Sequence, residues 1–153
     1  IFKKDCIAGL YSIQSGADSS VACIECPQGR YSSASGLSSR EKCNKCPAGK
    51  NNAHYGSNST DACEKCGINT KAAAEGSPEC VACDAGTVSG FGSAKCQTCG
   101  GGTFNDGTSE ECQTCAVGLY RSGSLANATL CLECPMGFSQ KEKGQASCLP
   151  CIP

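Results

Sequence analysis

The 153-residue chain combines 17 cysteines with no tryptophan, and its 13 basic and 14 acidic residues leave a net charge of −1. Leu, Ile, Val and Phe make up about 14% of it, too little to offset the ordering entropy of a conventional globule. The basic and acidic side chains are interspersed, with no basic stripe for nucleic acid, and no apolar run approaches the roughly 20 residues of a membrane span. Because the chain begins without Met, we expect a mature product or a piece of a longer precursor.

Taken in order, the chain is an array of paired cysteines. The pairs have two residues between their members and recur every 16 to 20 residues, and Cys6 stands alone before the first of them. They are Cys23 and Cys26, Cys43 and Cys46, Cys63 and Cys66, Cys80 and Cys83, Cys96 and Cys99, Cys112 and Cys115, Cys131 and Cys134, and Cys148 and Cys151.

The repeating unit is clearest in residues 26–46. It opens with Cys-Pro-x-Gly, which predicts a type I turn with proline at its second position and glycine at its fourth. Tyr31 follows as a β-former, and Ser35-Gly36 can turn the chain back toward Cys43. Each unit therefore predicts a turn, a short strand, a second turn and a return to a cysteine.

Glycine recurs at two places in the unit. The first place, three residues after the cysteine that opens each loop, holds Asn69 once, and Asn is the non-glycine residue best able to adopt a positive φ. That exception favours a backbone reason for the glycine. The first set is Gly9, Gly29, Gly49, Gly86, Gly102, Gly118 and Gly137, and the second is Gly16, Gly36, Gly56, Gly76, Gly92, Gly107, Gly123 and Gly144.

These signals predict small disulfide-rich modules in a linear array, with short β-hairpins and turns, almost no helix, no single large core and the shape of an elongated rod. Only residues 71–75 could form a helical turn. Apolar residues two places after the first glycine are expected to pack on the neighbouring disulfide: Tyr11, Tyr31, Val88, Phe104 and Tyr120, with Phe138 one place early. The expected division is a leader at 1–5, eight modules at 6–25, 26–45, 46–65, 66–82, 83–98, 99–114, 115–133 and 134–150, and the start of a further module at 151–153.

Three interpretations of the cysteines are open. In the first, each loop-opening cysteine bonds the next cysteine along, which uses every cysteine but Cys151 and needs no companion for Cys6. A second interlocks neighbouring pairs, with Cys26 bonded to Cys46, and the third binds zinc at four-cysteine spacing. We prefer the first, whose pairs are Cys6–Cys23, Cys26–Cys43, Cys46–Cys63, Cys66–Cys80, Cys83–Cys96, Cys99–Cys112, Cys115–Cys131 and Cys134–Cys148.

Few other residues predict chemistry. Asn58 and Asn127 begin glycosylation sequons, which together with the cysteines favour the secretory pathway. His54 is the only histidine, so no catalytic constellation can be assembled, and we expect no enzyme, cofactor or resident metal. The acidic residues around Asp106-Gly107 lack the alternating ligands of a calcium loop, and a hairpin turn is the better interpretation.

The unit Cys-Pro-x-Gly-x-Tyr-Ser…Gly…Cys-x-x-Cys resembles the ephrin-receptor-like cysteine-rich repeat, and it is similar to the first loop of tumour-necrosis-factor-receptor modules. In that receptor family the loop-opening cysteine bonds the next one along, which the resemblance therefore implies here. Uninterrupted arrays of the simpler unit resemble protist surface proteins, such as ciliate immobilisation antigens and the proteins of flagellar hairs (mastigonemes).

Two classes of function are open. One is an extracellular structural protein, a segment of a filament, stalk or cell-surface coat that assembles with copies of itself or with other extracellular proteins and carries N-linked glycans. The other is a receptor ectodomain that binds a protein ligand through its loop tips. The tips are rich in Ser, Gly, Ala and Asn and poor in the aromatic and Arg anchors of binding hot spots, so we favour the structural class.

Overall fold

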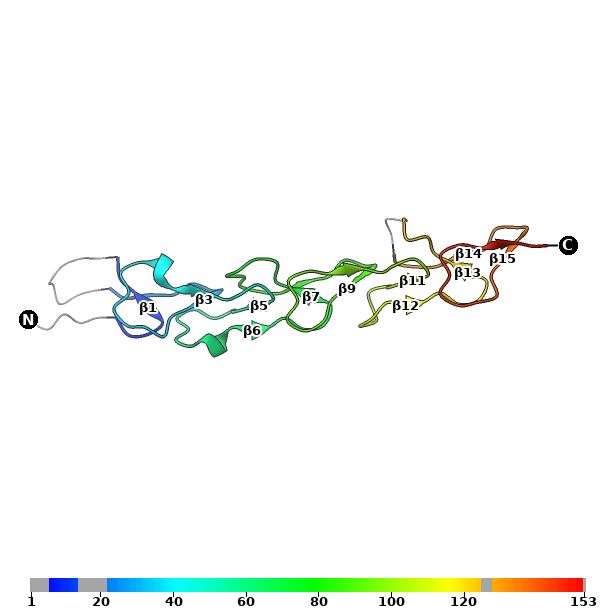
Figure 1. Cartoon of the computed structure of the whole chain (residues 1–153). Helices are drawn as coiled ribbons and strands as arrows, with labels where there is room; N and C mark the ends of the chain where they lie inside the picture. Colours follow the sequence, from blue (N-terminus) through cyan, green and yellow to red (C-terminus); the bar gives the residue numbers. More distant parts are fainter. Residues whose placement is uncertain (1–5, 14–21, 125–127, 153) are drawn as a thin grey trace, which may run out of the picture. The chain divides into compact units, whose positions relative to one another are not determined.

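The computed structural model describes residues 6–13, 22–124 and 128–152, and the predicted leader and Gly16 lie outside them. The described chain folds into antiparallel hairpins of two-residue strands, with two single-turn 3-10 helices, η1 (Arg40–Lys42) and η2 (Thr60–Ala62) (Figure 1). The hairpins pair β1 (Leu10–Tyr11) with β2 (Ile24–Glu25), β3 (Arg30–Tyr31) with β4 (Asn44–Lys45), β5 (Lys50–Asn51) with β6 (Glu64–Lys65), β7 (Thr70–Lys71) with β8 (Val81–Ala82), β9 (Thr87–Val88) with β10 (Gln97–Thr98), β11 (Thr103–Phe104) with β12 (Gln113–Thr114), β13 (Leu119–Tyr120) with β14 (Leu132–Glu133), and β15 (Phe138–Ser139) with β16 (Leu149–Pro150). The predicted fold class, small modules of hairpins and turns without a large core, is confirmed.

The second strand of every hairpin is the pair of residues between two cysteines. In the second module, for example, Asn44 and Lys45 lie between Cys43 and Cys46 and pair with Tyr31 and Arg30. Successive side chains of a strand alternate between faces, so cysteines three residues apart leave it in opposite directions. The two sulfurs of a pair are therefore placed to bond different partners.

The first turn of each module differs from the predicted type I turn. The Arg30 amide donates to the Pro27 carbonyl at 3.1 Å, so proline is the first residue of the hydrogen-bonded turn and Gly29 is the third. Gly29 has a φ of +76°, the conformation that a type II turn requires at its third position. The turn thus begins one residue later than predicted, because the glycine and not the proline determines its type.

The predicted helical turn at residues 71–75 is wrong. Lys71 lies in β7, and the chain turns at Glu75 and Gly76. The Ala72 carbonyl accepts from the Gly49 amide at 2.9 Å, and the Ala72 amide donates to the Ser93 carbonyl at 3.2 Å. A single helical turn is marginal on its own, so these bonds to neighbouring modules hold the segment extended.

The core is small and consists largely of sulfur. Tyr11 packs with Cys26 and Cys43, and the half-buried Leu37 completes this cluster. The expectation that aromatic residues pack on a neighbouring disulfide is thus met at Tyr11. At the equivalent place near the other end, Phe138 is 44% exposed, in keeping with its shifted position.

The chain divides into two compact units. The first comprises residues 1–67, 71–81 and 91–95, and the second comprises 68–70, 82–90 and 96–153. The hydrogen bonds between modules each join residues of the same unit. No helix of the described residues has the length and apolar character to cross a membrane.

Candidate functional site at the interface between modules

Eight disulfides close the eight loops in tandem. Their partners are Cys6 and Cys23, Cys26 and Cys43, Cys46 and Cys63, Cys66 and Cys80, Cys83 and Cys96, Cys99 and Cys112, Cys115 and Cys131, and Cys134 and Cys148. This is the first of the three connectivities considered above. Cys151 is exposed and unpaired, and its amide donates to the Gly137 carbonyl as the amides of other loop-opening cysteines do to theirs.

The pairing makes a direct prediction for the purified protein. Proteolysis without reduction, followed by mass spectrometry, is expected to recover peptides that link Cys26 to Cys43 and Cys46 to Cys63, because these sulfurs are bonded in the fold. Peptides that link Cys26 to Cys46 would instead establish the interlocked pairing.

A backbone ladder joins each module to the next. We call the residue three places after a loop-opening cysteine the turn residue, and the one six places after it the buried residue. The amide of each turn residue donates to the carbonyl of the next module's buried residue, with N···O distances of 2.7–2.9 Å. The pairs are Gly9 with Ser32, Gly29 with Asn52, Gly49 with Ala72, Asn69 with Ser89, Gly86 with Asn105, Gly102 with Arg121, and Gly118 with Gln140.

The buried residue was not foreseen from the sequence. It is buried in all eight modules. One occupant, Ala72, is apolar, and the other seven are polar: Ser12, Ser32, Asn52, Ser89, Asn105, Arg121 and Gln140. Its side chain often satisfies backbone groups, either of its own module, as where Asn52 Oδ1 accepts from the His54 amide at 3.0 Å, or of the preceding one, as where Asn52 Nδ2 donates to the Arg30 carbonyl at 2.9 Å. A small polar residue at constant spacing from a glycine is the signal that could have revealed it.

A second contact joins each module to the one after next. A Cβ placed on Gly29 would lie 1.9 Å from the carbonyl oxygen of Gly76, two modules further along. A Cβ on Gly9 would lie 2.1 Å from the Gly56 carbonyl oxygen, and a Cβ on Gly49 would lie 2.0 Å from the Gly92 carbonyl oxygen. The turn glycine is therefore required for two reasons, its positive φ and the approach of another backbone, and only the first was predicted.

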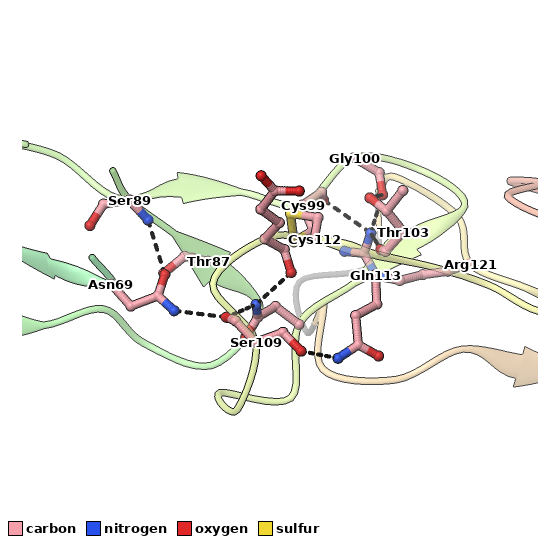
Figure 2. The surroundings of a disulfide bond; sticks show 12 residues. Asn69, Thr87, Ser89, Cys99, Gly100, Thr103, Ser109, Cys112, Gln113 and Arg121 are labelled. Carbon is pink, nitrogen blue, oxygen red and sulfur yellow. Dashed lines mark hydrogen bonds between the residues drawn. A yellow bond between two sulfur atoms is a disulfide. The ribbon is translucent and has the colours of Figure 1, made fainter. Parts of the chain in front are cut away.

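Asn69 shows how the interface changes where the glycine is absent. Its φ is +56°, which confirms the predicted backbone role of this position. Its Nδ2 donates to the Ser109 carbonyl at 2.7 Å, and its Oδ1 accepts from the Ser89 amide at 3.2 Å (Figure 2). An amide side chain thus reaches a module two places along, where the other modules place backbone against backbone.

Arg121 is the other departure from the repeat. It is fully buried, and its Nη1 donates to the carbonyls of Cys99, Gly100 and Thr103 at 3.0, 2.6 and 2.9 Å (Figure 2). All three carbonyls belong to the turn that opens the preceding module. The guanidinium therefore fixes that turn with charge-assisted hydrogen bonds, and the repeat pattern contained no sign of this role.

The remaining residues singled out from the sequence do not form a reactive site. His54 is exposed, and its amide donates to Asn52 Oδ1. The Thr108 hydroxyl, 2.6 Å from Asp106 Oδ1, and the Thr108 amide lower the pKa of the Asp106 carboxyl and tie it into a turn. In the part of the chain that the structure describes, no group of three His, Cys, Asp or Glu side chains could hold a metal ion.

Of the two sequon asparagines, only Asn58 can be placed. It is exposed, and the following residue, Ser59, caps η2 by accepting from the Asp61 amide at 3.1 Å. Asn127 lies outside the described residues.

Comparison with known proteins agrees with this geometry. Residues 9–63 match the family described as tyrosine-protein kinase ephrin type A/B receptor-like. These residues form ephrin-receptor-like cysteine-rich repeats. The matched segment spans the first three modules, and the same ladder and tandem disulfides continue through the described residues beyond it. No curated protein matches the chain. Ephrin-receptor-like repeats with many disulfides indicate an extracellular module.

Proposed function

We propose that this chain is a structural segment of an extracellular filament, stalk or cell-surface coat. The observation that carries the proposal is the interface between modules. Each module within a unit is bonded to the next through backbone groups and approached by the backbone of the one after next, as between Gly29 and Gly76. These contacts use few side chains, so loop tips can vary while the array stays joined.

The cysteines and the repeat family support the extracellular setting. Repeats of this kind are typically not enzymes, and eight tandem disulfides persist in oxidising compartments. We further propose that the exposed Asn58 carries an N-linked glycan, and Asn127 is retained as a second acceptor on its sequon alone. Flagellar hairs and protist coats are settings in which such a segment would serve.

The alternative is a receptor ectodomain, and the specific observation in its favour is the receptor-like family match of residues 9–63. A ligand would then contact loop tips, since the ladder itself is internal. Under this alternative the protein stays monomeric and binds a soluble protein ligand tightly.

An elongated shape is the first testable consequence. Small-angle scattering of the full chain is expected to give a radius of gyration well above the about 15 Å of a compact globule of this length. The physical reason is that the hydrogen bonds between modules, among the described residues, reach only the next module or the one after next, as in repeat arrays that lack contacts between distant modules. A value near the compact expectation would refute the rod.

The same sample separates the two functions. A recurring face suits lateral or end-to-end association, so sedimentation at increasing concentration is expected to show assemblies. Strictly monomeric behaviour at high concentration, combined with tight binding of a soluble ligand, would establish the receptor instead.

A further inference from the structure

Two successive hairpins oppose like charges. The register of β3 and β4 places Arg30 opposite Lys45, and that of β5 and β6 places Lys50 opposite Lys65. Positive charges directly opposite each other destabilise a strand pair. Residues 30–65, which span both hairpins, hold six of the 13 basic side chains and three of the 14 acidic ones, so the segment keeps a net positive charge.

The fold does not require these charges. In β9–β10 and β11–β12 the same pair of positions holds two threonines. The side chains of Lys45 and Lys65 do have a packing role, since their aliphatic stems cover Gly76 and Gly92. At the corresponding contacts, however, Glu25 covers Gly56 and Thr114 covers Gly144. The contact with this glycine therefore needs the carbon atoms of a side chain and not its positive charge.

The charged ends are accessible. Lys45 and Lys65 are exposed, and Arg30 and Lys50 are partly so. The Arg30 guanidinium is held in place by a 2.8 Å hydrogen bond from Nη1 to the Cys43 carbonyl. Arg30 and Lys45 line a shallow hollow together with Glu41 and Glu75, so an anion bound to this cationic pair has to compete with two carboxylates.

We propose that the hairpins β3–β4 and β5–β6 bind a sulfated polysaccharide. Cross-strand partners have Cβ atoms about 5 Å apart, so two cationic ends can converge on one sulfate group. A polysaccharide carries sulfates repeatedly, and two cationic pairs in consecutive modules can therefore engage one chain together. The proposal rests on the extracellular setting argued above, where such polymers occur, and it is independent of whether the protein forms filaments.

The test compares two triple variants of the full chain for binding to dextran sulfate. K45Q/K50Q/K65Q removes three cations of the paired hairpins, and glutamine keeps a stem over Gly76 and Gly92. K95Q/K141Q/K143Q removes the same net charge elsewhere. The K45Q/K50Q/K65Q variant is expected to bind dextran sulfate about tenfold more weakly at 0.15 M salt. Its binding is also expected to depend less steeply on the salt concentration, because fewer cations contact the polyanion. The control variant is expected to bind within twofold of the parent, and uncharged dextran is expected not to bind.

Three outcomes would overturn the proposal. They are no binding of dextran sulfate by the parent at 0.15 M salt, equal losses in the two triple variants, or stronger retention by anionic phospholipid vesicles than by dextran sulfate. Failure here leaves the scattering and sedimentation results unaffected, so the structural function and the polysaccharide site are judged separately.

Discussion

Reduction of the disulfides is expected to unfold the whole chain, whereas a metal chelator is expected to leave it folded. Each bridge closes a loop with a sequence separation of 13 to 17 residues, and such a closure contributes about 3 kcal/mol in the chain-entropy model. Folded domains are stable by only about 5–15 kcal/mol. The stabilisation lost with a few of the eight bridges therefore exceeds the stability that the small core can supply.

Circular dichroism and the dispersion of amide signals in NMR spectra measure the outcome. Treatment with a thiol reductant is expected to abolish the native signals, and re-oxidation under exchange conditions is expected to restore them. The matched control is a chelator at the same pH without reductant. Unfolding by the chelator, together with about one zinc per four cysteines by elemental analysis, would replace the disulfide scaffold with a metal-bound one.

The parts of this fold that repeat a residue type at a fixed distance from a cysteine could be predicted from the sequence. Cysteine spacing indicated the loops, and the exchange of glycine for Asn69 indicated a positive φ, which is now seen at +56°. The hairpins followed from a turn signal before a β-former. Each of these features places a particular residue type at a fixed distance from a cysteine, and that leaves a pattern in the sequence.

The interface between modules could not be predicted in the same way, because most of it is backbone. A carbonyl approaching a glycine from two modules away has no residue type of its own, so Gly76 gives no sign that it contacts Gly29. The buried residue is equally hard to recognise, since its occupants range from Ala72 to Arg121. What they share is a carbonyl that accepts from a neighbouring amide. Nor does composition show which basic residues face each other across a hairpin.

The contact between a module and the one after next can be measured with two glycines that share the turn position and differ in that contact. Gly102 and Gly118 have φ values of +75° and +81°, and both donate to the next module's buried residue. A Cβ on Gly102 would lie 1.9 Å from the Gly144 carbonyl oxygen, whereas a Cβ on Gly118 would meet nothing within 4 Å. Alanine at either site costs about 1–2 kcal/mol for the left-handed conformation. The difference between the two variants therefore contains the clash, together with any change in the Arg121 hydrogen bonds to the turn of Gly102.

We expect Gly102→Ala to be less stable than Gly118→Ala by a further 1–3 kcal/mol, roughly the cost of inserting a methyl group into a packed site. Guanidinium unfolding without reductant measures the difference in the global free energy of unfolding. Hydrogen exchange at the Gly144 amide, which donates to the Cys115 carbonyl at 2.9 Å, measures the free energy of local opening at that site. Because 1.4 kcal/mol corresponds to about a tenfold change in an opening equilibrium, that amide is expected to exchange roughly tenfold faster or more in Gly102→Ala. In Gly118→Ala, whose turn follows the Cys115 acceptor directly, a smaller increase is expected, because this variant lacks the clash. Equal destabilisation by the two substitutions, with unchanged exchange at Gly144, would show that modules are held by their immediate neighbours alone. The structural proposal would then lose the contact between a module and the one after next, which is part of its support.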